Sequence, residues 1–251
     1  MSGREIAGTT AIVTGASRGF GRAIAAALVG AGARVVGLAR DGDALEKLHG
    51  ELGNSLVPVV GDAADKDLAE ELLESYTPRT LVLNAGANPV TRPLHEHTWD
   101  TFRGNWETDV QHVFHWVRQA LRQPLAPGSC VVSVSSGAAL RGSPLSGGYA
   151  GAKATVRFIS NYAADESQQL GLGIRFVSVL PTLTPETDLG ANGVAAYAAL
   201  QGVDVATFVR GLRPVLTPRH VGTALVGLAG DPDPDQTHLA YTLNANGLKP
   251  V

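Results

Sequence analysis

The fold of this chain is decided by one stretch near its start, Thr9-Thr10-Ala11-Ile12-Val13-Thr14-Gly15-Ala16-Ser17-Arg18-Gly19-Phe20-Gly21. Its first six residues are an apolar, β-branched run that predicts a buried strand, and a helical pattern begins directly after Gly21. A glycine-rich turn between a strand and a helix lets the backbone approach a pyrophosphate, and the helix N-terminus offers it unpaired N–H groups. The stretch therefore predicts a dinucleotide site around Gly15, Gly19 and Gly21; the alternative is a glycine-rich turn that binds nothing.

Strands and helices alternate along the rest of the chain. Further strands are predicted at 34–39, 55–60, 80–83, 129–134, 174–180 and 239–243, with helices near 44–52, 66–76, 98–123, from 149, and 218–228. Such alternation is typical of a parallel, doubly wound sheet, so we expect an α/β fold. No low-complexity run interrupts it, which predicts a single domain over residues 1–251. Residues 183–214 follow a strand end and predict a lobe that covers the substrate.

Composition excludes several classes of function. The 251 residues are 44% hydrophobic with a net charge of -3, which gives no electrostatic reason to expect nucleic acid or an anionic membrane as partner. The N-terminus has no signal-peptide core, and no run approaches the ~18 apolar residues of a membrane span. The single cysteine, Cys130, lies in an apolar run and predicts a buried structural thiol. We therefore expect a cytoplasmic protein.

The end of the second predicted strand indicates which dinucleotide binds. Arg40 stands where a nucleotide-binding unit meets the adenosine ribose, a position at which an acid would take the 2′-hydroxyl. Arg40 and Arg18 of the glycine turn can instead clamp a 2′-phosphate. Asp41 opposes this interpretation if it binds the ribose, but it also suits the cap of the next helix. We favour the cap, and predict NADP(H) over NAD(H).

Two polar residues follow further strands. Asp62 and Asn84 fall at strand C-termini, the edge where doubly wound sheets bind ligands, although either also suits a plain turn. The helix at 98–123 carries more aromatic residues than one buried stripe needs, which indicates core packing or in part a subunit interface. Its His112 and His115 lack a cysteine or carboxylate at ligand spacing, so we interpret them as ordinary polar residues and predict no metal site.

Tyr149 and Lys153 are the residues most suited to chemistry. A spacing of four places both side chains on one face of a helix. An ammonium held close to a phenol favours the phenolate, which makes a proton donor and acceptor that works near physiological pH. The pair also arises by chance on many helices. The pair indicates a catalytic site only if a nucleotide site and a second polar side chain lie next to it.

Four stretches in order resemble the short-chain dehydrogenase/reductase family. Residues 14–21 are similar to its T-G-x-x-x-G-x-G motif, Asn84-Ala85-Gly86 to its N-A-G motif and Tyr149-x-x-x-Lys153 to its Y-x-x-x-K motif, while Ser136 stands where the family keeps its active-site serine. The resemblance runs from about Gly8 to the last strand. It implies a Rossmann-type fold with a seven-stranded sheet, and hydride transfer at C4 of a nicotinamide.

The resemblance also implies roles for the matched residues. Tyr149 would be the general acid or base, Lys153 would bind the nicotinamide ribose, and Ser136 would hydrogen-bond the substrate oxygen. Asp62 would contact adenine, and Asn84 would shape the pocket near the ribose. The expected cofactor contacts are Gly15, Ser17, Arg18, Gly19, Phe20, Gly21, Arg40, Asp62, Ala63, Asn84, Ala85, Gly86, Tyr149, Lys153, Pro181, Thr182 and Thr184.

The chain departs from the family pattern at two site positions. Asp109 replaces an asparagine that is thought to hold a water linking the lysine to solvent, and a carboxylate there would pair with Lys153. Our hypothesis is that this catalytic relay survives in Asp109 with a shifted pH profile. Thr182 replaces a glycine after the sixth strand, and Thr184 or Thr187 would then contact the nicotinamide end of the cofactor.

The sequence therefore predicts an NADP(H)-dependent oxidoreductase that interconverts a carbonyl and a secondary alcohol, with ketone reduction favoured. Val90, Leu140, Tyr197 and Phe208 are the expected pocket walls, and they suit an apolar or polyfunctional ketone. The family resemblance also implies a homodimer or homotetramer. Two alternatives stay open: another step on the same fold (imine or enone reduction, epimerisation or rearrangement), and an NADP(H)-binding regulator without catalysis.

Overall fold

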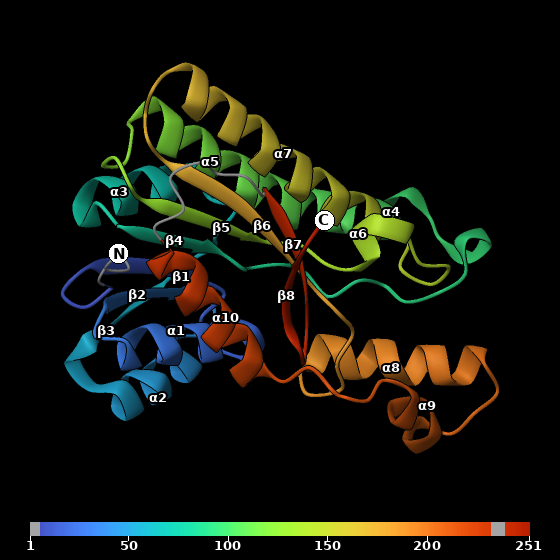
Figure 1. Cartoon of the computed structure of the whole chain (residues 1–251). Coiled ribbons are helices and arrows are strands. Elements are labelled where there is room, and N and C mark those ends of the chain that lie inside the picture. The colour runs from blue at the N-terminus through green and yellow to red at the C-terminus, as the bar shows by residue number, and fades with distance from the viewer. Residues whose placement is uncertain (1–5, 232–238) are drawn as a thin grey trace.

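The computed structural model describes residues 6–231 and 239–251, so residues 1–5, predicted to lack a signal-peptide core, lie outside it. Its strands form one sheet in the order β3-β2-β1-β4-β5-β6-β7-β8 (Figure 1). Seven strands run parallel: β1 (Thr10–Thr14), β2 (Arg34–Ala39), β3 (Leu56–Val60), β4 (Thr80–Leu83), β5 (Cys130–Val134), β6 (Arg175–Pro181) and β7 (Ala240–Asn244). The doubly wound parallel sheet is confirmed.

The predicted strand number is one too few. An eighth strand, β8 (Gly247–Pro250), pairs antiparallel with β7 at the edge of the sheet. The two strands are joined by a tight turn in which Asn244 pairs with Gly247, whose φ of 110° suits only glycine. The Asn246-Gly247 dipeptide is a hairpin signal that could have predicted this strand.

Helices cover both faces of the sheet (Figure 1). On one face lie α1 (Gly19–Gly30), α2 (Gly42–Leu52) and α10 (Pro218–Gly230), and on the other α3 (Lys66–Tyr76), α5 (Gln111–Arg122) and α7 (Tyr149–Gln169). Each face has its own apolar core: Ile24, Leu28 and Leu225 belong to the first, Trp116, Val156 and Phe176 to the second. Both faces of the parallel strands are therefore buried, which leaves the carboxyl edge of the sheet for ligands.

The helix predicted at 98–123 is interrupted. It consists of α4 (Trp99–Asn105), a π-helical segment η3 (Trp106–Val110) and α5. The π turn was not predicted, because the spacing of the aromatic residues fits an ordinary helix equally well. Single π turns inside helices are frequent at functional sites. This one carries Asp109.

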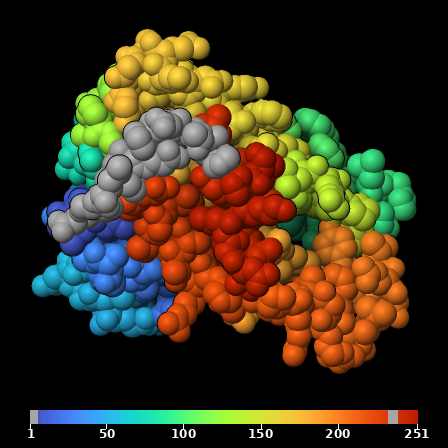
Figure 2. All heavy atoms as spheres, in the orientation of Figure 1, coloured from blue at the N-terminus to red at the C-terminus, as the bar shows by residue number. Residues whose placement is uncertain are grey.

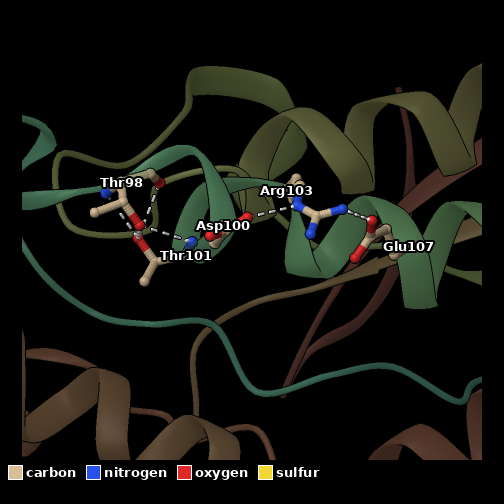
Figure 3. A network of polar contacts seen from close by, with 5 residues as sticks. All are labelled: Thr98, Asp100, Thr101, Arg103 and Glu107. Carbon is tan, nitrogen blue, oxygen red and sulfur yellow. Dashed lines mark hydrogen bonds and ion pairs between the residues drawn. The ribbon is translucent and has the colours of Figure 1, made fainter.

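A polar network holds the start of this interrupted helix (Figure 3). Thr98 caps α4: its hydroxyl accepts from the Thr101 amide at 3.3 Å, and the Thr101 hydroxyl accepts from the Thr98 amide at 3.0 Å. Arg103 pairs with Asp100 at 3.0 Å and with Glu107 of the π segment. The cap and the two pairs stabilise α4 and join it to η3.

The predicted lobe at 183–214 contains α8 (Asp188–Leu200) and α9 (Val205–Gly211). It projects from the body of the molecule and is drawn in orange in Figures 1 and 2. Three short helical turns, η1 (Gly53–Ser55), η2 (Leu94–Glu96) and α6 (Ala138–Arg141), complete the described elements. None of the described helices combines the length and the apolar character that crossing a bilayer requires.

Candidate active site

A cavity of about 940 Å³ lies at the carboxyl edge of the sheet, between the strand ends and the lobe. Every residue predicted above for cofactor binding or chemistry lines it except Gly21. These residues come from the ends of β1, β2, β3, β4, β5 and β6, from η3, from the start of α7 and from the lobe. The fold therefore brings residues far apart in the sequence to one place, while their individual roles stay predictions.

The glycine turn fits closely against the end of β4. Gly15 has a φ of 67°, and a Cβ there would lie 2.9 Å from the Cα of Ala85. A Cβ at Gly21 would lie 2.0 Å from the carbonyl oxygen of Gly15, so Gly21 is needed for packing inside the turn rather than for lining the cavity. Arg18, the residue before α1, gives that helix no side-chain cap. The first N–H groups of α1 are thus left for an anion, which fits the pyrophosphate of a dinucleotide.

Hydrogen bonds join the ends of β1 and β4 below this turn. The hydroxyl of Thr14 accepts from the amides of Asn84 and Ala85 at 2.9 and 3.1 Å. The Asn84 side chain donates to the Thr14 carbonyl at 3.0 Å. Asn84 was expected to shape the ribose pocket, and these bonds show how it holds the floor of the cavity in place.

The predicted adenosine end carries exposed charges. Arg40 lines the cavity and forms no ion pair with another described residue. Arg18 pairs with Asp188 of α8 at 3.3 Å. Asp41 caps α2 by accepting from the Ala44 amide at 3.0 Å, as predicted, and this contact occupies the acid that would otherwise favour NAD(H). Asp62 accepts from the Ala64 amide at 2.9 Å, a contact typical of a turn residue. A contact of Asp62 with adenine stays a prediction.

The opposite end of the cavity holds Tyr149 and Lys153. Tyr149 is the first residue of α7, and the Lys153 ammonium lies one turn later, 5.8 Å from the centre of the tyrosine ring. Lys153 is buried and donates to the Val134 carbonyl at 3.1 Å. Ser136 follows β5, and its hydroxyl oxygen accepts from the Ala138 amide at 3.2 Å, which leaves its hydrogen to donate elsewhere. All three side chains face a shared space.

Asp109 of the π segment completes this end. It is fully buried, accepts from the Ala87 amide at 2.8 Å and forms an ion pair with Lys153 at 3.0 Å, as predicted. Gly86 makes room for it, because a Cβ there would lie 2.9 Å from the carboxylate. Burial alone would lower the pKa of Lys153, but the negative charges of the Asp109 carboxylate and of a Tyr149 phenolate raise it above its ordinary value. Lys153 therefore stays an ammonium ion.

His112 is a cavity residue that the sequence analysis missed. It is fully buried, lines the cavity and packs edge-on against Trp116 at 6.3 Å, a location that its interpretation as an ordinary polar residue did not include. Burial and the nearby Lys153 charge lower its pKa to about 3, which keeps the imidazole neutral. Its position three residues after Asp109, on the same helix face, was the available signal. In the part of the chain that the structure describes, no three His, Cys, Asp or Glu side chains gather as metal ligands would.

Three threonines predicted at the nicotinamide end make contacts of their own. The Thr184 hydroxyl is buried and donates to the Leu216 carbonyl, while the Thr182 amide donates to the Leu243 carbonyl at 2.9 Å. Thr187 caps α8 by accepting from the Gly190 amide at 3.1 Å. The Thr182 bond reaches β7, the Thr184 bond joins the two ends of the lobe, and a contact of either Thr184 or Thr187 with the cofactor stays a prediction.

The substrate side of the cavity differs in part from expectation. Tyr197 lines it, but Val90, Leu140 and Phe208 do not. Leu140 is exposed on α6, and Phe208 stacks behind Tyr197 with ring centres 6.4 Å apart. The walls that the sequence analysis missed come from loops, from the end of α6 and from α8: Thr91, Arg141, Ser143, Leu145, Leu183 and Leu189.

Comparison with known proteins agrees with this geometry. The model of the short chain dehydrogenase family matches residues 9–197. Over 188 residues the chain is 34% identical to a D-erythrulose reductase from Gallus gallus, which covers 73% of this chain and 74% of the reductase. Over 187 residues it is 32% identical to a probable NADP-dependent dehydrogenase from Haemophilus influenzae, covering 72% and 73% of the two chains.

A solved structure with the same fold is that of a protein proposed to be an NAD(P) dependent gluconate 5-dehydrogenase, from Beutenbergia cavernae, with NADP bound at low occupancy. It is 27% identical, superimposes with a TM-score of 0.77, and the match covers 93% of this chain and 94% of the other.

Proposed function

This chain belongs to the short chain dehydrogenase family, and we propose that it is an NADP(H)-dependent oxidoreductase that interconverts a ketone and a secondary alcohol. The observation that carries the proposal is that Tyr149 and the buried Lys153 face the same cavity as the glycine turn. When bound there, the nicotinamide would supply or accept a hydride. Ketone reduction is the direction we favour.

The proton chemistry belongs to side chains of this chain. Tyr149 donates its phenolic proton to the ketone oxygen, and takes it back in the oxidative direction. Lys153, kept protonated beside Asp109, provides a positive charge that favours the phenolate after the proton has left, and the carboxylate at 3.0 Å weakens the field of that charge. The Ser136 hydroxyl donates to the same substrate oxygen as negative charge develops on it.

Arg18 and Arg40 support NADP(H) as the cofactor. Both line the end of the cavity next to β2, and Arg40 is not committed to a carboxylate in the described residues. A 2′-phosphate would bind between guanidinium groups at this corner. The relatives point the same way, since one is a probable NADP-dependent dehydrogenase and another carries NADP.

The relatives also narrow the chemistry of the substrate. The D-erythrulose reductase acts on a small polyhydroxylated ketone, which favours the polyfunctional over the purely apolar ketone for this chain. Imine or enone reduction, epimerisation and rearrangement on the same fold remain the alternative enzymatic step. The non-catalytic regulator is disfavoured, because a regulator has no use for a buried lysine and carboxylate beside a tyrosine.

Tyr149→Phe tests the proposed function. The substitution keeps the ring of the side chain and removes its proton, so turnover of a ketone panel with NADPH should fall by at least about 100-fold, the range of general acid catalysis. NADPH binding, measured by fluorescence titration, should persist, which separates a catalytic from a structural defect. Turnover in the variant equal to that of the wild type would contradict the proposal.

We also propose that the chain forms a homo-oligomer through α5 and α7, which lie side by side (Figure 1). Trp106 and Phe114, eight residues apart, are 39% and 49% exposed, and Phe158 and Tyr162 on α7 are 50% and 65% exposed. An apolar face of this kind suits burial against a second copy. Sedimentation of the wild type should give a multiple of 26.0 kDa, and Phe158→Glu should lower it. A wild type that sediments as a monomer would contradict this.

The predicted cytoplasmic location stays a prediction.

A further inference from the structure

One face of α8 forms the wall of the cavity that lies on the lobe. Leu189, Gly193 and Tyr197 all line the cavity, and their spacing of four residues places them in one stripe along the helix. Gly193 adds no side chain between the other two, so the stripe is open between Leu189 and Tyr197. Asp188, at the start of the helix, also lines the cavity but pairs with Arg18, so Tyr197 is the polar side chain that this stripe presents to a bound substrate.

The Tyr197 ring is held in place from behind. Phe208 of α9 stacks on it with an angle of 12° between the rings and 6.4 Å between their centres. The stack fixes the ring plane, which leaves little freedom to the hydroxyl at its end. Both rings belong to the same lobe, because Tyr197 lies on α8 and Phe208 on α9.

Tyr197 lines the same cavity as Tyr149. Its hydroxyl forms no hydrogen bond with any residue that the structure describes, although the ring is half-buried. Burial raises the pKa of Tyr197, and the charge of a nearby Tyr149 phenolate raises it further, so Tyr197 stays protonated. A phenol that keeps its proton is suited to hydrogen bonding and not to proton transfer.

We propose that Tyr197 is a substrate-positioning residue that binds a hydroxyl group on the carbon beside the reacting carbonyl, so that the enzyme selects α-hydroxy ketones. The inference rests on the proposed function, because it takes Tyr149 as the residue that binds the carbonyl oxygen. A substrate between the two tyrosines presents its carbonyl to one phenol and its neighbouring hydroxyl to the other. A ketone without that hydroxyl would leave the Tyr197 phenol unpaired in a partly dry site, which costs affinity.

The test uses two ketones of nearly equal size, 1-hydroxyhexan-2-one and heptan-3-one, in which a hydroxyl replaces a methyl group. Each is titrated by calorimetry into protein saturated with NADP⁺, which reports binding without turnover, and each is then tested for reduction with NADPH. The wild type should prefer the hydroxy ketone by about 10-fold in affinity and in KM.

Tyr197→Phe keeps the stack on Phe208 and removes only the hydroxyl, so this preference should fall to about one. The matched control, Phe208→Leu, loosens the ring without removing the hydroxyl; it should weaken binding of both ketones and retain a preference. A preference that survives in Tyr197→Phe, or a wild type that binds both ketones equally, would overturn the inference.

The two proposals fail in different ways. Binding of the hydroxy ketone with the expected preference, but no reduction of either ketone by the wild type, would contradict the proposed function while supporting Tyr197 as the residue that binds the hydroxyl. Reduction of both ketones at equal KM would support the proposed function and overturn the role of Tyr197.

Discussion

The two ends of the cavity carry ion pairs of similar length in opposite surroundings. At the catalytic end Lys153 and Asp109 lie 3.0 Å apart with side chains 7% and 1% exposed, whereas at the adenosine end Arg18 and Asp188 lie 3.3 Å apart and are 69% and 71% exposed. A buried pair is costly to break because the remaining charge is left without water, while an exposed pair contributes little. The buried charges are therefore committed to each other, and the exposed arginine is available to a ligand.

The largest expected effect comes from breaking the buried pair. Lys153→Met leaves the Asp109 carboxylate buried without a counter-charge and should lower the free energy of unfolding by about 3–5 kcal/mol. Lys153→Met/Asp109→Asn should recover most of that loss, because the asparagine oxygen still accepts from the Ala87 amide. Urea denaturation of the wild type and both variants measures this. Equal stability of the single and double variants would show that the pair is not desolvated as described.

The next effect concerns His112 and acid. Its folded pKa of about 3 lies below its ordinary value of 6.5, so between these values the unfolded chain binds a proton that the folded chain does not. The stabilising contribution of the neutral imidazole is present above pH 6.5 and is lost as the pH falls towards 3, by about 1.4 kcal/mol per pH unit.

His112→Leu removes this titration. Its free energy of unfolding should therefore depend less steeply on pH than that of the wild type, by about one proton in the range below pH 6.5. Urea denaturation at several pH values gives the slope of the free energy of unfolding against pH for the wild type and for the variant. Parallel curves for wild type and variant would contradict a neutral, buried His112.

A smaller effect is expected when the charge of Asp109 is removed and its shape is kept. Asp109→Asn should keep or raise kcat, because the side chain can still hold the Ala87 amide and a water of the proton relay. Without the carboxylate, burial lowers the pKa of Lys153, so the alkaline limb of the kcat profile should move to lower pH. Ketone reduction followed across pH tests both points. A complete loss of activity would refute the relay hypothesis.

The smallest effect belongs to the exposed pair. Asp188→Asn should change the free energy of unfolding by less than about 1 kcal/mol, since both side chains are solvated. The substitution removes the carboxylate that competes with a 2′-phosphate for Arg18. NADPH should therefore bind a few-fold tighter, a gain in binding free energy of less than about 1 kcal/mol. Thermal denaturation and fluorescence titration of this variant provide the comparison with the buried pair. A loss of stability in Asp188→Asn as large as that in Lys153→Met would contradict the distinction between a buried ion pair at one end of the cavity and an exposed pair at the other.

The positions of many strands and helices could be predicted from the sequence. The predicted bounds of β2, β4 and α3 coincide with those in the structure, because the apolar runs of the strands stop at Arg40 and Asn84 and Asp65 caps the helix. The site residues also gather as predicted, since all of them follow strand ends or lie on helices that a doubly wound sheet directs to its carboxyl edge.

Features that depend on packing between distant segments were not predictable in this way. The π turn at 106–110 and the burial of His112 arise where η3 and α5 pack against α7. Phe208 was expected at the cavity and instead supports Tyr197, because the pairing of α9 with α8 decides which aromatic ring faces inward. The loops that present Thr91 and Leu145 have no periodic pattern from which their direction follows.

The most direct test of the account is a titration of the purified protein with NADPH and NADH side by side. If Arg18 and Arg40 receive a 2′-phosphate at the exposed end, NADPH should bind at least about 10-fold tighter, a difference of about 1.4 kcal/mol. Equal or tighter binding of NADH would contradict this and would assign the ribose to an acid such as Asp41 instead of the two arginines.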